Sequence, residues 1–554
     1  MPKRRLGNYP AALDRPSDMA HPSSEPPPTP PDWPHCGHGA TAEDLVGCRG
    51  IHVPGHTACL AHLDEADRDA YLAGLAPGAD IDHRGTPFTA DLLDRLLDAL
   101  RDPATGHPRL GTARFGSAAF EREAWFVSAT FEGDALFASA AFEREAWFAS
   151  ATFQGIAEFG SATFQGGAWF ESATVKGNAV FVGVVFERAA DLGPLVCAGR
   201  VVLSRAVFGG PVTLSFAARR LECRRTRWSS TAELRLRYAT VDFSHAVFEY
   251  PLTIAAEADP FVPFDSRPVR EELLAGAPDA GVRLASLRRV DAAHLVLADV
   301  DLSGCLFTGT VHLDQLRLEG ACSFATVPPG THRVRGRPVR FTPRRTLAEE
   351  HHWRALQPAA VRGWNTAVLG AGHAGPAQLA PVYRALRKAL EDGKDEPGAA
   401  DFYYGECEMR RHDPSTPRAE RALLSLYWAV SGYGLRASRA LGWLAAAMLL
   451  TIVLLMGFGL PRESPQQEAT GTVPPGGGRV TFTIDKEDPK NPTGNRFTGE
   501  RFEKAVNVTL NSVVFRSSGQ DLTTVGTYIE MASRLAEPVL LGLAVLAVRG
   551  RVKR

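Results

Sequence analysis

Residues 113–189 repeat an eleven-residue unit seven times, reading ARFGSAAFERE, AWFVSATFEGD, ALFASAAFERE, AWFASATFQGI, AEFGSATFQGG, AWFESATVKGN and AVFVGVVFERA. In each unit a small residue stands two positions before a large one, so the large residues are alternately five and six apart. An amphipathic helix needs apolar residues three and four apart, and a half-buried strand needs strict alternation. The repeat therefore predicts a chain that turns a small-x-large triplet inward, makes a corner, and then repeats.

Such a chain folds as a solenoid in which each triplet forms one face. Four faces use two units, so we expect 22 residues per coil, with stacked coils paired backbone to backbone at about 4.8 Å. Each coil buries its large residues only against the neighbouring coils. The predicted β-helix core consists of Phe115, Phe120, Phe126, Phe131, Phe137, Phe142, Phe148, Phe153, Phe159, Phe164, Phe170, Phe181 and Phe186.

These triplets resemble the pentapeptide-repeat family, whose consensus is a small residue, any residue, Leu or Phe, and two variable residues. The frame weakens after residue 189 and returns at Phe243, Phe248 and Phe324, so the resemblance covers residues 111–325. It implies a mainly β fold, a right-handed quadrilateral β-helix. The sixth residue in alternate units departs from the consensus and implies one longer corner for each pair of faces. The family does not imply one activity.

The overall charge is close to zero, with 61 Lys and Arg residues against 62 Asp and Glu residues. This balance indicates an ordinary folded protein, and we expect no nucleic-acid partner. Some proteins of the family imitate DNA through a dense acidic surface. Here residues 113–171 carry eight acids and three arginines, whereas arginines cluster in residues 219–227. We expect solvated corners or, alternatively, contact of the basic part with anionic lipid headgroups.

Residues 441–460 are uncharged over 20 positions, which is the length needed to cross a hydrocarbon core of about 30 Å. A second stretch, residues 525–549, reaches spanning length but carries three charged residues in its first half. Basic residues such as Arg439 and Arg551 stand at the outer ends of both stretches. They predict a multi-pass protein of the cell inner (plasma) membrane, with its N-terminal domains and its C-terminus in the cytoplasm.

Residues 383–411 resemble the connector that joins pentapeptide rods to a two-helix, ion-channel-like module in bacterial membrane proteins. In that resemblance residues 502–515 are a pore helix, and a filter begins with Thr523, Thr524, Val525 and Gly526. A potassium filter coordinates ions with successive carbonyls of a Thr-Val-Gly-Tyr-Gly run. Because the second glycine is missing here, we expect a degenerate, filter-like segment in a membrane anchor.

Seven Cys and His side chains fall within residues 36–62. Zinc takes four tetrahedral ligands, and thiolate and imidazole suit it. The preferred metal-binding set is Cys36, Cys48, Cys59 and His62. A structural zinc ion is the one candidate cofactor; the alternative is buried thiols and surface histidines. No apolar leader precedes the eight scattered cysteines, so we expect reduced, cytoplasmic thiols. The run 349–352, Glu-Glu-His-His, is read as an exposed polar segment.

No Ser/His/Asp or phosphate-loop pattern occurs in the chain, and we expect no enzyme activity. The favoured function is a membrane-anchored scaffold whose cytoplasmic β-helix binds proteins. The alternatives are an ion-channel-like protein with two transmembrane helices and a zinc-binding regulatory membrane protein. Expected partners are the lipid bilayer, an unknown cytoplasmic protein and a homo-oligomer formed through the membrane module. Abundant Ala, Arg, Gly and Pro suggest a bacterial, actinobacterial source.

The sequence thus predicts eight segments. They are a disordered Pro-rich N-terminus (1–34), a Cys/His-containing helical globule (35–110), the pentapeptide-repeat β-helix (111–325), a helical connector (326–440), transmembrane helix 1 (441–460), an extracytoplasmic loop with a degenerate pore-like segment (461–524), transmembrane helix 2 (525–549) and a cytoplasmic basic tail (550–554).

Overall fold

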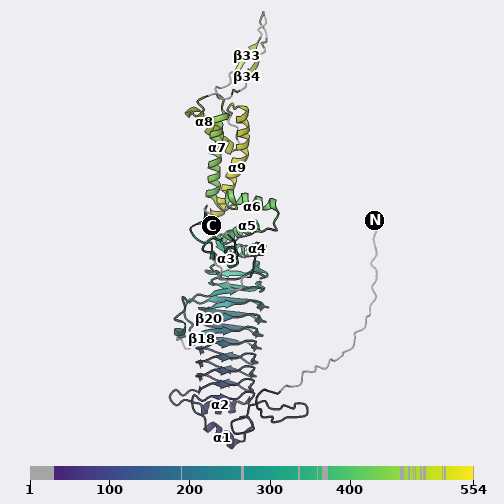
Figure 1. The fold of residues 1–554 in the computed structure, drawn as a ribbon, viewed down its shortest axis with the longest axis vertical. Helices are drawn as coiled ribbons and strands as arrows, with labels where there is room; N and C mark the ends of the chain where they lie inside the picture. Colours follow the sequence, from purple (N-terminus) through teal and green to yellow (C-terminus); the bar gives the residue numbers. More distant parts are fainter. Residues whose placement is uncertain are drawn as a thin grey trace, which may run out of the picture.

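The computed structural model describes residues 30–552 apart from 189, 264–267, 335–336, 359, 365–371, 462–466, 472–474, 478, 481, 487–488, 491–493, 515 and 517–518. Most of the predicted Pro-rich N-terminus, 1–29, and residues 553–554 of the predicted tail lie outside the described residues. The molecule is a long rod of stacked β-coils, with α1 and α2 at one end and a group of helices at the other (Figure 1).

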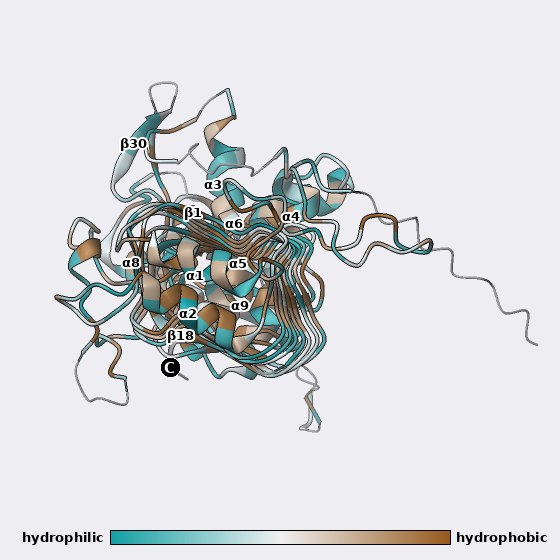
Figure 2. Ribbon diagram, turned by 90° about the horizontal axis from the view of Figure 1, so that it is seen from below, coloured by the Kyte–Doolittle hydropathy of each residue, from teal (hydrophilic) through white to brown (hydrophobic). Residues whose placement is uncertain are grey.

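Each regular turn of the rod contributes four short parallel strands. One turn consists of β4 (Ala113–Arg114), β5 (Ala119–Phe120), β6 (Ala124–Trp125) and β7 (Thr130–Phe131). β4 pairs with β8 (Ala135–Leu136), so that Ala113 lies beside a residue 22 positions later. The predicted β-helix with 22 residues per coil is therefore confirmed for the regular stack. Viewed along the rod, the coils form nested loops (Figure 2).

The remaining short strands of the regular stack repeat this arrangement. They are β9 (Ala141–Phe142), β10 (Ala146–Trp147), β11 (Thr152–Phe153), β12 (Ala157–Glu158), β13 (Thr163–Phe164), β14 (Ala168–Trp169), β15 (Thr174–Val175), β16 (Ala179–Val180) and β17 (Val185–Phe186). One face of the rod is an 8-stranded sheet, and the other three faces join in a 20-stranded sheet.

The core is built from phenylalanine rings that stack from turn to turn. The Phe148 ring lies 5.1 Å from that of Phe126 and 4.9 Å from that of Phe170, nearly parallel to both. All thirteen predicted core phenylalanines are buried, as are the small residues two positions before them, twelve alanines and Val184. An alanine is needed there because the rings already fill the interior at close to crystal density. The corner residues Ser117 and Ser139 take a left-handed backbone, with φ of 57° and 58°.

The turns shorten within residues 190–202, where the pairing falls from 22 positions at Ala190 to 20 at Arg200, which corrects the expectation of 22 residues throughout. Val212 pairs with Ala232, and Ala232 pairs with Leu252, each 20 residues later. Here the sixth residue of alternate units is lost, and strands run around corners without a break. These strands are β18 (Ala190–Val202), β19 (Val207–Phe208), β20 (Val212–Glu222), β21 (Arg227–Trp228), β22 (Ala232–Arg237), β23 (Thr240–Asp242), β24 (Val247–Phe248) and β25 (Leu252–Ala256).

An excursion then interrupts the stack, because Leu252 pairs with Leu295 across 43 positions. Within it, the short helix η1 (Glu272–Leu274) packs Leu274 with Phe261 against the outside of β18 and β20. The last coils contain β26 (Arg283–Ser286), β27 (Leu295–Ala298), η2 (Leu313–Gln315) and β28 (Arg317–Glu319).

The rod begins earlier than the predicted boundary at residue 111. β1 (Ile81–Asp82) pairs with β4, and β2 (Pro87–Phe88) pairs with β5, so both belong to the first turn. β3 (Arg109–Leu110) completes that turn, and α2 (Ala90–Ala99) is inserted before it. This helix buries four leucines in the rod core, and α1 (Glu65–Ala73) lies beside it across the end of the coils (Figure 2).

The other end of the rod is closed by α3 (Ala348–Ala355). Its Glu349 carboxylate accepts hydrogen bonds from the backbone amides of Phe307, at 2.5 Å, and Thr308, at 3.0 Å. These amides would otherwise be left unpaired where the coils stop. The run 349–352 is thus no exposed polar segment, because Glu349, Glu350 and His351 are buried. The prediction of an exposed segment was wrong because the packing of α3 against the rod, and not the polar composition of the run, determines its burial.

The predicted helical connector contains strands as well as helices. The strands are β29 (Ala325–Thr326), β30 (Thr331–Val334), β31 (Arg337–Arg340) and β32 (Arg345–Thr346), and the helices after α3 are α4 (Pro376–Asp392), α5 (Glu396–His412) and α6 (Arg418–Ser431). Beyond them stand the long apolar helices α7 (Ala437–Leu454), which ends in the wider turn η3 (Leu455–Gly459), and α9 (Thr524–Val552). Between these two lie β33 (Gln467–Gly471), β34 (Phe482–Lys486) and α8 (Gly499–Val513).

A buried ionic network joins α3, which closes the rod, to the helices α4 and α5. Glu350 of α3 pairs with Arg344 at 2.5 Å and with Arg354 at 2.6 Å, and it accepts a hydrogen bond from the Tyr383 hydroxyl of α4. Arg354 also contacts Glu408 of α5, at 3.1 Å. Buried charges are tolerated only when they are paired in this way. The network holds three helices in one arrangement at the top of the rod.

Candidate functional site

The four predicted metal ligands meet in the segment before α1. The ligand atoms of Cys36, Cys48, Cys59 and His62 all lie within 4.8 Å of one another. The Cys48 and Cys59 sulfurs are 3.7 Å apart, and His62 Nδ1 is 3.3 Å from the Cys59 sulfur and 3.6 Å from the Cys36 sulfur. All four cysteine and histidine side chains come from loops, with no helix between them.

The other three histidines of this segment have different partners. The ring of His38 stacks on that of His62, with centroids 4.2 Å apart. His52 Nε2 lies 2.9 Å from a backbone carbonyl oxygen, and His56 Nδ1 lies 3.3 Å from the Asp67 carboxylate. The fold therefore selects one histidine of the four as the partner of the thiols.

Two of the thiols share a proton. The hydrogen bond from Cys59 is the largest cause that lowers the pKa of Cys48, to about 5, and the same contact raises the pKa of Cys59. The contact therefore favours the thiolate form of Cys48 over that of Cys59, and the thiolate is the form that binds metals.

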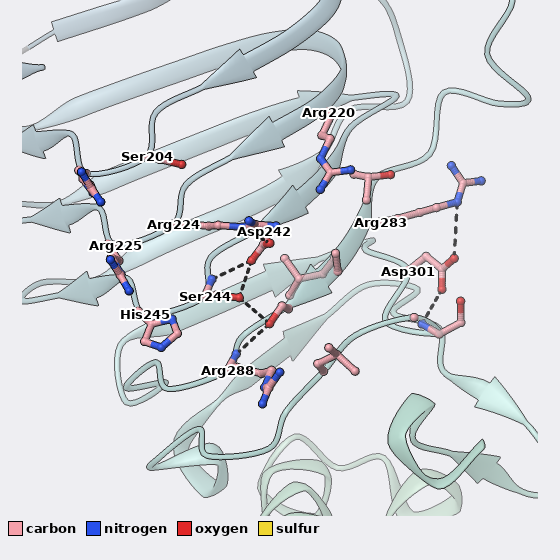
Figure 3. Close-up of a pocket in the computed structure, with 18 of the residues that line it drawn as sticks. Ser204, Arg220, Arg224, Arg225, Asp242, Ser244, His245, Arg283, Arg288 and Asp301 are labelled. Carbon is pink, nitrogen blue, oxygen red and sulfur yellow. Dashed lines mark hydrogen bonds and ion pairs between the residues drawn. The ribbon is translucent and has the colours of Figure 1, made fainter. Parts of the chain in front are cut away.

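A basic groove of about 920 Å³ opens on the side of the rod across the 20-residue turns (Figure 3). Arg205, Arg225 and His245 follow one another at the same corner of successive turns, with φ of 64°, 57° and 65°. This corner is occupied by serine in the regular stack, so the exchange of Ser for Arg and His creates the basic column. Arg205 and Arg225 are exposed, and neither side chain forms an ion pair within the described part of the chain.

Several neighbouring arginines are already neutralised, which limits the predicted basic cluster in residues 219–227. Arg220 pairs with Glu222 at 2.9 Å, and Arg224 pairs with Asp242 at 2.7 Å. Burial alone would raise the pKa of Asp242, but hydrogen bonds from Ser244 and the charge of Arg224 lower it. The available positive charge is therefore that of the corner column rather than of the whole cluster.

The filter-like segment begins a helix. Thr524, Val525 and Gly526 form the first turn of α9, and the Thr523 hydroxyl caps it by accepting a hydrogen bond from the Gly526 amide at 3.1 Å. A filter needs successive carbonyls that point toward an ion, whereas these carbonyls are aligned along the helix. The filter-like interpretation is therefore corrected: these four residues cap and start α9.

Gly526 has a packing role instead. A β-carbon placed on it would lie 2.3 Å from the carbonyl oxygen of Gly459, so only glycine lets the two backbones approach. The predicted pore helix corresponds to α8, whose Arg501 donates to the carbonyl oxygens of Met456 and Leu460 at 2.8 and 2.9 Å. α8 thus clamps the end of the first apolar helix.

We expect Gly526→Ala to destabilise the contact between α7 and α9 by about 1–3 kcal/mol, because a methyl group must displace the backbone of Gly459. Gly542→Ala is the matched control on the same helix, since a β-carbon there meets open space. Alanine favours helix over glycine, so the control should be neutral or stabilising. Thermal unfolding of the purified chain in detergent measures both. Equal melting temperatures for the two variants would contradict the packing role.

The two apolar helices are long and apolar enough to cross a membrane. They comprise Ala437–Gly459, with mean hydropathy 2.3, and Thr524–Arg549, with mean hydropathy 1.7. Only 28% and 22% of their most apolar windows are buried within the protein. Large apolar side chains such as Leu449, Leu450 and Leu546 face outward. Glu537 faces inward and accepts a hydrogen bond from Thr451 of α7 at 2.9 Å.

Comparison with known proteins identifies the repeat. Residues 148–193 match the family model described as pentapeptide repeats (9 copies). No curated protein matches the chain, and no solved structure matches it. The matched segment lies inside the stack of coils whose phenylalanines form the core. The chain therefore contains pentapeptide repeats folded as a β-solenoid, which is flanked by helices and followed by two helices able to span a membrane.

Proposed function

We propose that this protein is a membrane-anchored scaffold and not an enzyme, and that its rod presents a binding surface to a cytoplasmic protein. The observation that carries the proposal is the outward-facing apolar surface of α7 and α9. Core helices of a soluble protein bury such a surface, whereas these two helices leave most of it exposed. Lipid is the surrounding that makes this exposure favourable.

The orientation follows from the charges at the ends of the helices. Arg436 and Arg439 stand at the start of α7, and Arg549 and Arg551 stand at the end of α9. Basic residues favour the cytoplasmic side, which puts the rod in the cytoplasm beneath a bacterial inner membrane. The buried network around Glu350 joins α3, which closes the rod, to the helices α4 and α5.

The basic groove is the surface best suited to a partner. Its free charges are those of Arg205 and Arg225, and it is wide enough to admit a peptide segment. The helices α3–α6 lie between the rod and the helices α7 and α9 (Figure 1), so a lipid headgroup is a less suitable occupant than a protein. We therefore propose an acidic segment of a cytoplasmic protein as the occupant.

The anchor and the groove can be tested in native membranes. We expect the chain to stay with the membrane through an alkaline carbonate wash, which removes peripheral proteins. After cross-linking and detergent extraction, we expect a cytoplasmic protein to co-purify with it. The double variant Arg205→Asn/Arg225→Asn should recover at least about 10-fold less of this partner protein, because removal of two central charges costs more than about 1.4 kcal/mol of binding free energy. Asparagine tolerates the left-handed corner, so the rod keeps its fold.

The matched control is Arg122→Asn/Arg144→Asn, which removes two exposed arginines from other corners of the rod. This variant should retain the partner. Release of the chain by carbonate would contradict the anchor. Equal recovery of the partner by both double variants would contradict the groove as the binding surface.

A further inference from the structure

We propose that Cys36, Cys48, Cys59 and His62 bind one structural zinc ion, and that this ion fastens residues 35–63 as a lid onto the first turn of the rod. This inference is independent of the proposed scaffold function, because it concerns the end of the rod farthest from the apolar helices (Figure 1).

Three of the six distances between the ligand atoms match the edges of a zinc tetrahedron, and all six lie within 4.8 Å. Zinc binds sulfur at about 2.3 Å and histidine nitrogen at about 2.0–2.1 Å, so the edges of the tetrahedron are about 3.8 Å between sulfurs and about 3.6 Å between sulfur and nitrogen. The observed sulfur–sulfur distance of 3.7 Å from Cys48 to Cys59 agrees with this. So do the 3.3 and 3.6 Å distances from His62 Nδ1 to the sulfurs of Cys59 and Cys36.

The donor types select the metal class. Three thiolates and one imidazole are soft and borderline ligands, which suit zinc and not magnesium or calcium, which require oxygen ligands. Four protein ligands fill the coordination sphere and leave no position for substrate, which is the mark of a structural site. The Gly50 amide points at the Cys48 sulfur at 3.4 Å, and such second-shell donors support a charged thiolate ligand.

The lid contacts the rod through its backbone. The Ile51 amide donates to the Arg84 carbonyl of the first turn at 2.8 Å. A β-carbon on Gly85 would lie 2.3 Å from the Arg49 carbonyl oxygen, and one on Gly50 would lie 2.6 Å from the Cys59 β-carbon. The ligand loops therefore lie directly on the turn that contains β1 and β2.

The lid has only a small apolar core. Within residues 35–63 the buried apolar side chains are Val46, Val53, Cys59, Leu60 and Leu63, and the segment contains no helix or ladder strand. Val53, Leu60 and Leu63 pack into the core of the rod. Small units with so little apolar burial of their own are commonly reinforced by a metal or by disulfides. The cysteines are free, so their thiols are available to a metal.

The test uses the full chain, purified in detergent without chelator. We expect one zinc ion per chain by elemental mass spectrometry. Cobalt substituted for zinc should give the thiolate charge-transfer and visible bands of a tetrahedral site. The single variants Cys36→Ser, Cys48→Ser, Cys59→Ser and His62→Ala should each weaken zinc binding more than about 100-fold, which exceeds the effect of second-shell changes. His56→Ala and Cys322→Ser are the matched controls and should keep the metal.

Hydrogen exchange tests the role of the ion. Chelation of the zinc should remove protection at the Ile51 amide, while the Phe137 amide, which donates to the Glu158 carbonyl inside the rod, should stay protected. A metal-free chain with three reactive thiols in the lid would overturn the site. A disulfide between Cys48 and Cys59, or zinc retained by Cys48→Ser, would do the same. Unchanged exchange at Ile51 after chelation would overturn the fastening of the lid.

Discussion

Replacement of Phe148 by aspartate is expected to open the middle of the rod at a cost of about 5 kcal/mol or more. The ring is fully buried and lies against six others, those of Phe126 and Phe170 in its own column and those of Phe137, Phe142, Phe153 and Phe159 beside it. Loss of such a side chain alone costs about 3–5 kcal/mol, and an unpaired buried charge adds to this.

Because coils contact only their neighbours, the opening should be local. Hydrogen exchange should show it at the Phe126 and Phe148 amides, which donate to the carbonyls of Trp147 and Trp169 in adjacent turns. Arg144→Asp introduces the same residue at an exposed corner and should change stability by less than about 0.5 kcal/mol. Phe148→Leu should be mild, since the repeat accepts leucine there. A protected, protease-resistant Phe148→Asp rod would refute the stacked core.

Glu350→Gln is expected to destabilise the junction between the rod and the helices α4 and α5 by about 3–5 kcal/mol, because it leaves Arg344 buried without its anion and Arg354 with Glu408 alone. Urea unfolding monitored by tryptophan fluorescence of the connector measures the loss. Asp314→Asn breaks an exposed ion pair with Lys388 and should cost less than about 1 kcal/mol. Similar effects of the two variants would show that the network does not hold the junction.

The Glu350 carboxylate also makes the stability of the folded chain depend on pH, and the direction of this dependence follows from its pKa. Burial alone would raise the pKa of Glu350, but the charges of Arg344 and Arg354 outweigh it and lower the pKa from 4.5 to about 2. A lowered pKa stabilises the folded state above the ordinary value, and this stability, about 3 kcal/mol, disappears as the pH falls from 4.5 toward 2. The wild type should therefore lose more stability than Glu350→Gln over this interval. An equal loss would contradict the charged network.

The sequence was sufficient to predict the coil because the spacing of the large residues alone determines the four faces of each turn. A phenylalanine at every fifth and sixth position admits few other ways to bury the rings. The meeting of Cys36, Cys48, Cys59 and His62 was also predicted from the sequence, because cysteines and histidines are concentrated in one short segment. Metal binding itself stays a prediction.

Other features depended on contacts that no local pattern reveals. The first turn uses His83 in place of phenylalanine, where burial lowers its pKa to about 4, and α2 then interrupts the spacing. Gly526 looks like a filter residue by its neighbours in the sequence, but its neighbour in space is Gly459. The groove could not be predicted because it depends on the register of the shortened turns. This register brings Arg205 and Arg225 together although they stand 20 positions apart.

The 22-residue turn has a consequence for the height of the molecule. Ten residues, Ser117–Phe126, recur unchanged at Ser139–Phe148, one turn later. Gain or loss of such a cassette would preserve every inward side chain and change only the length. The length of the rod therefore changes by whole turns, and the distance between its tip and the helices α7 and α9 changes in steps of about 4.8 Å.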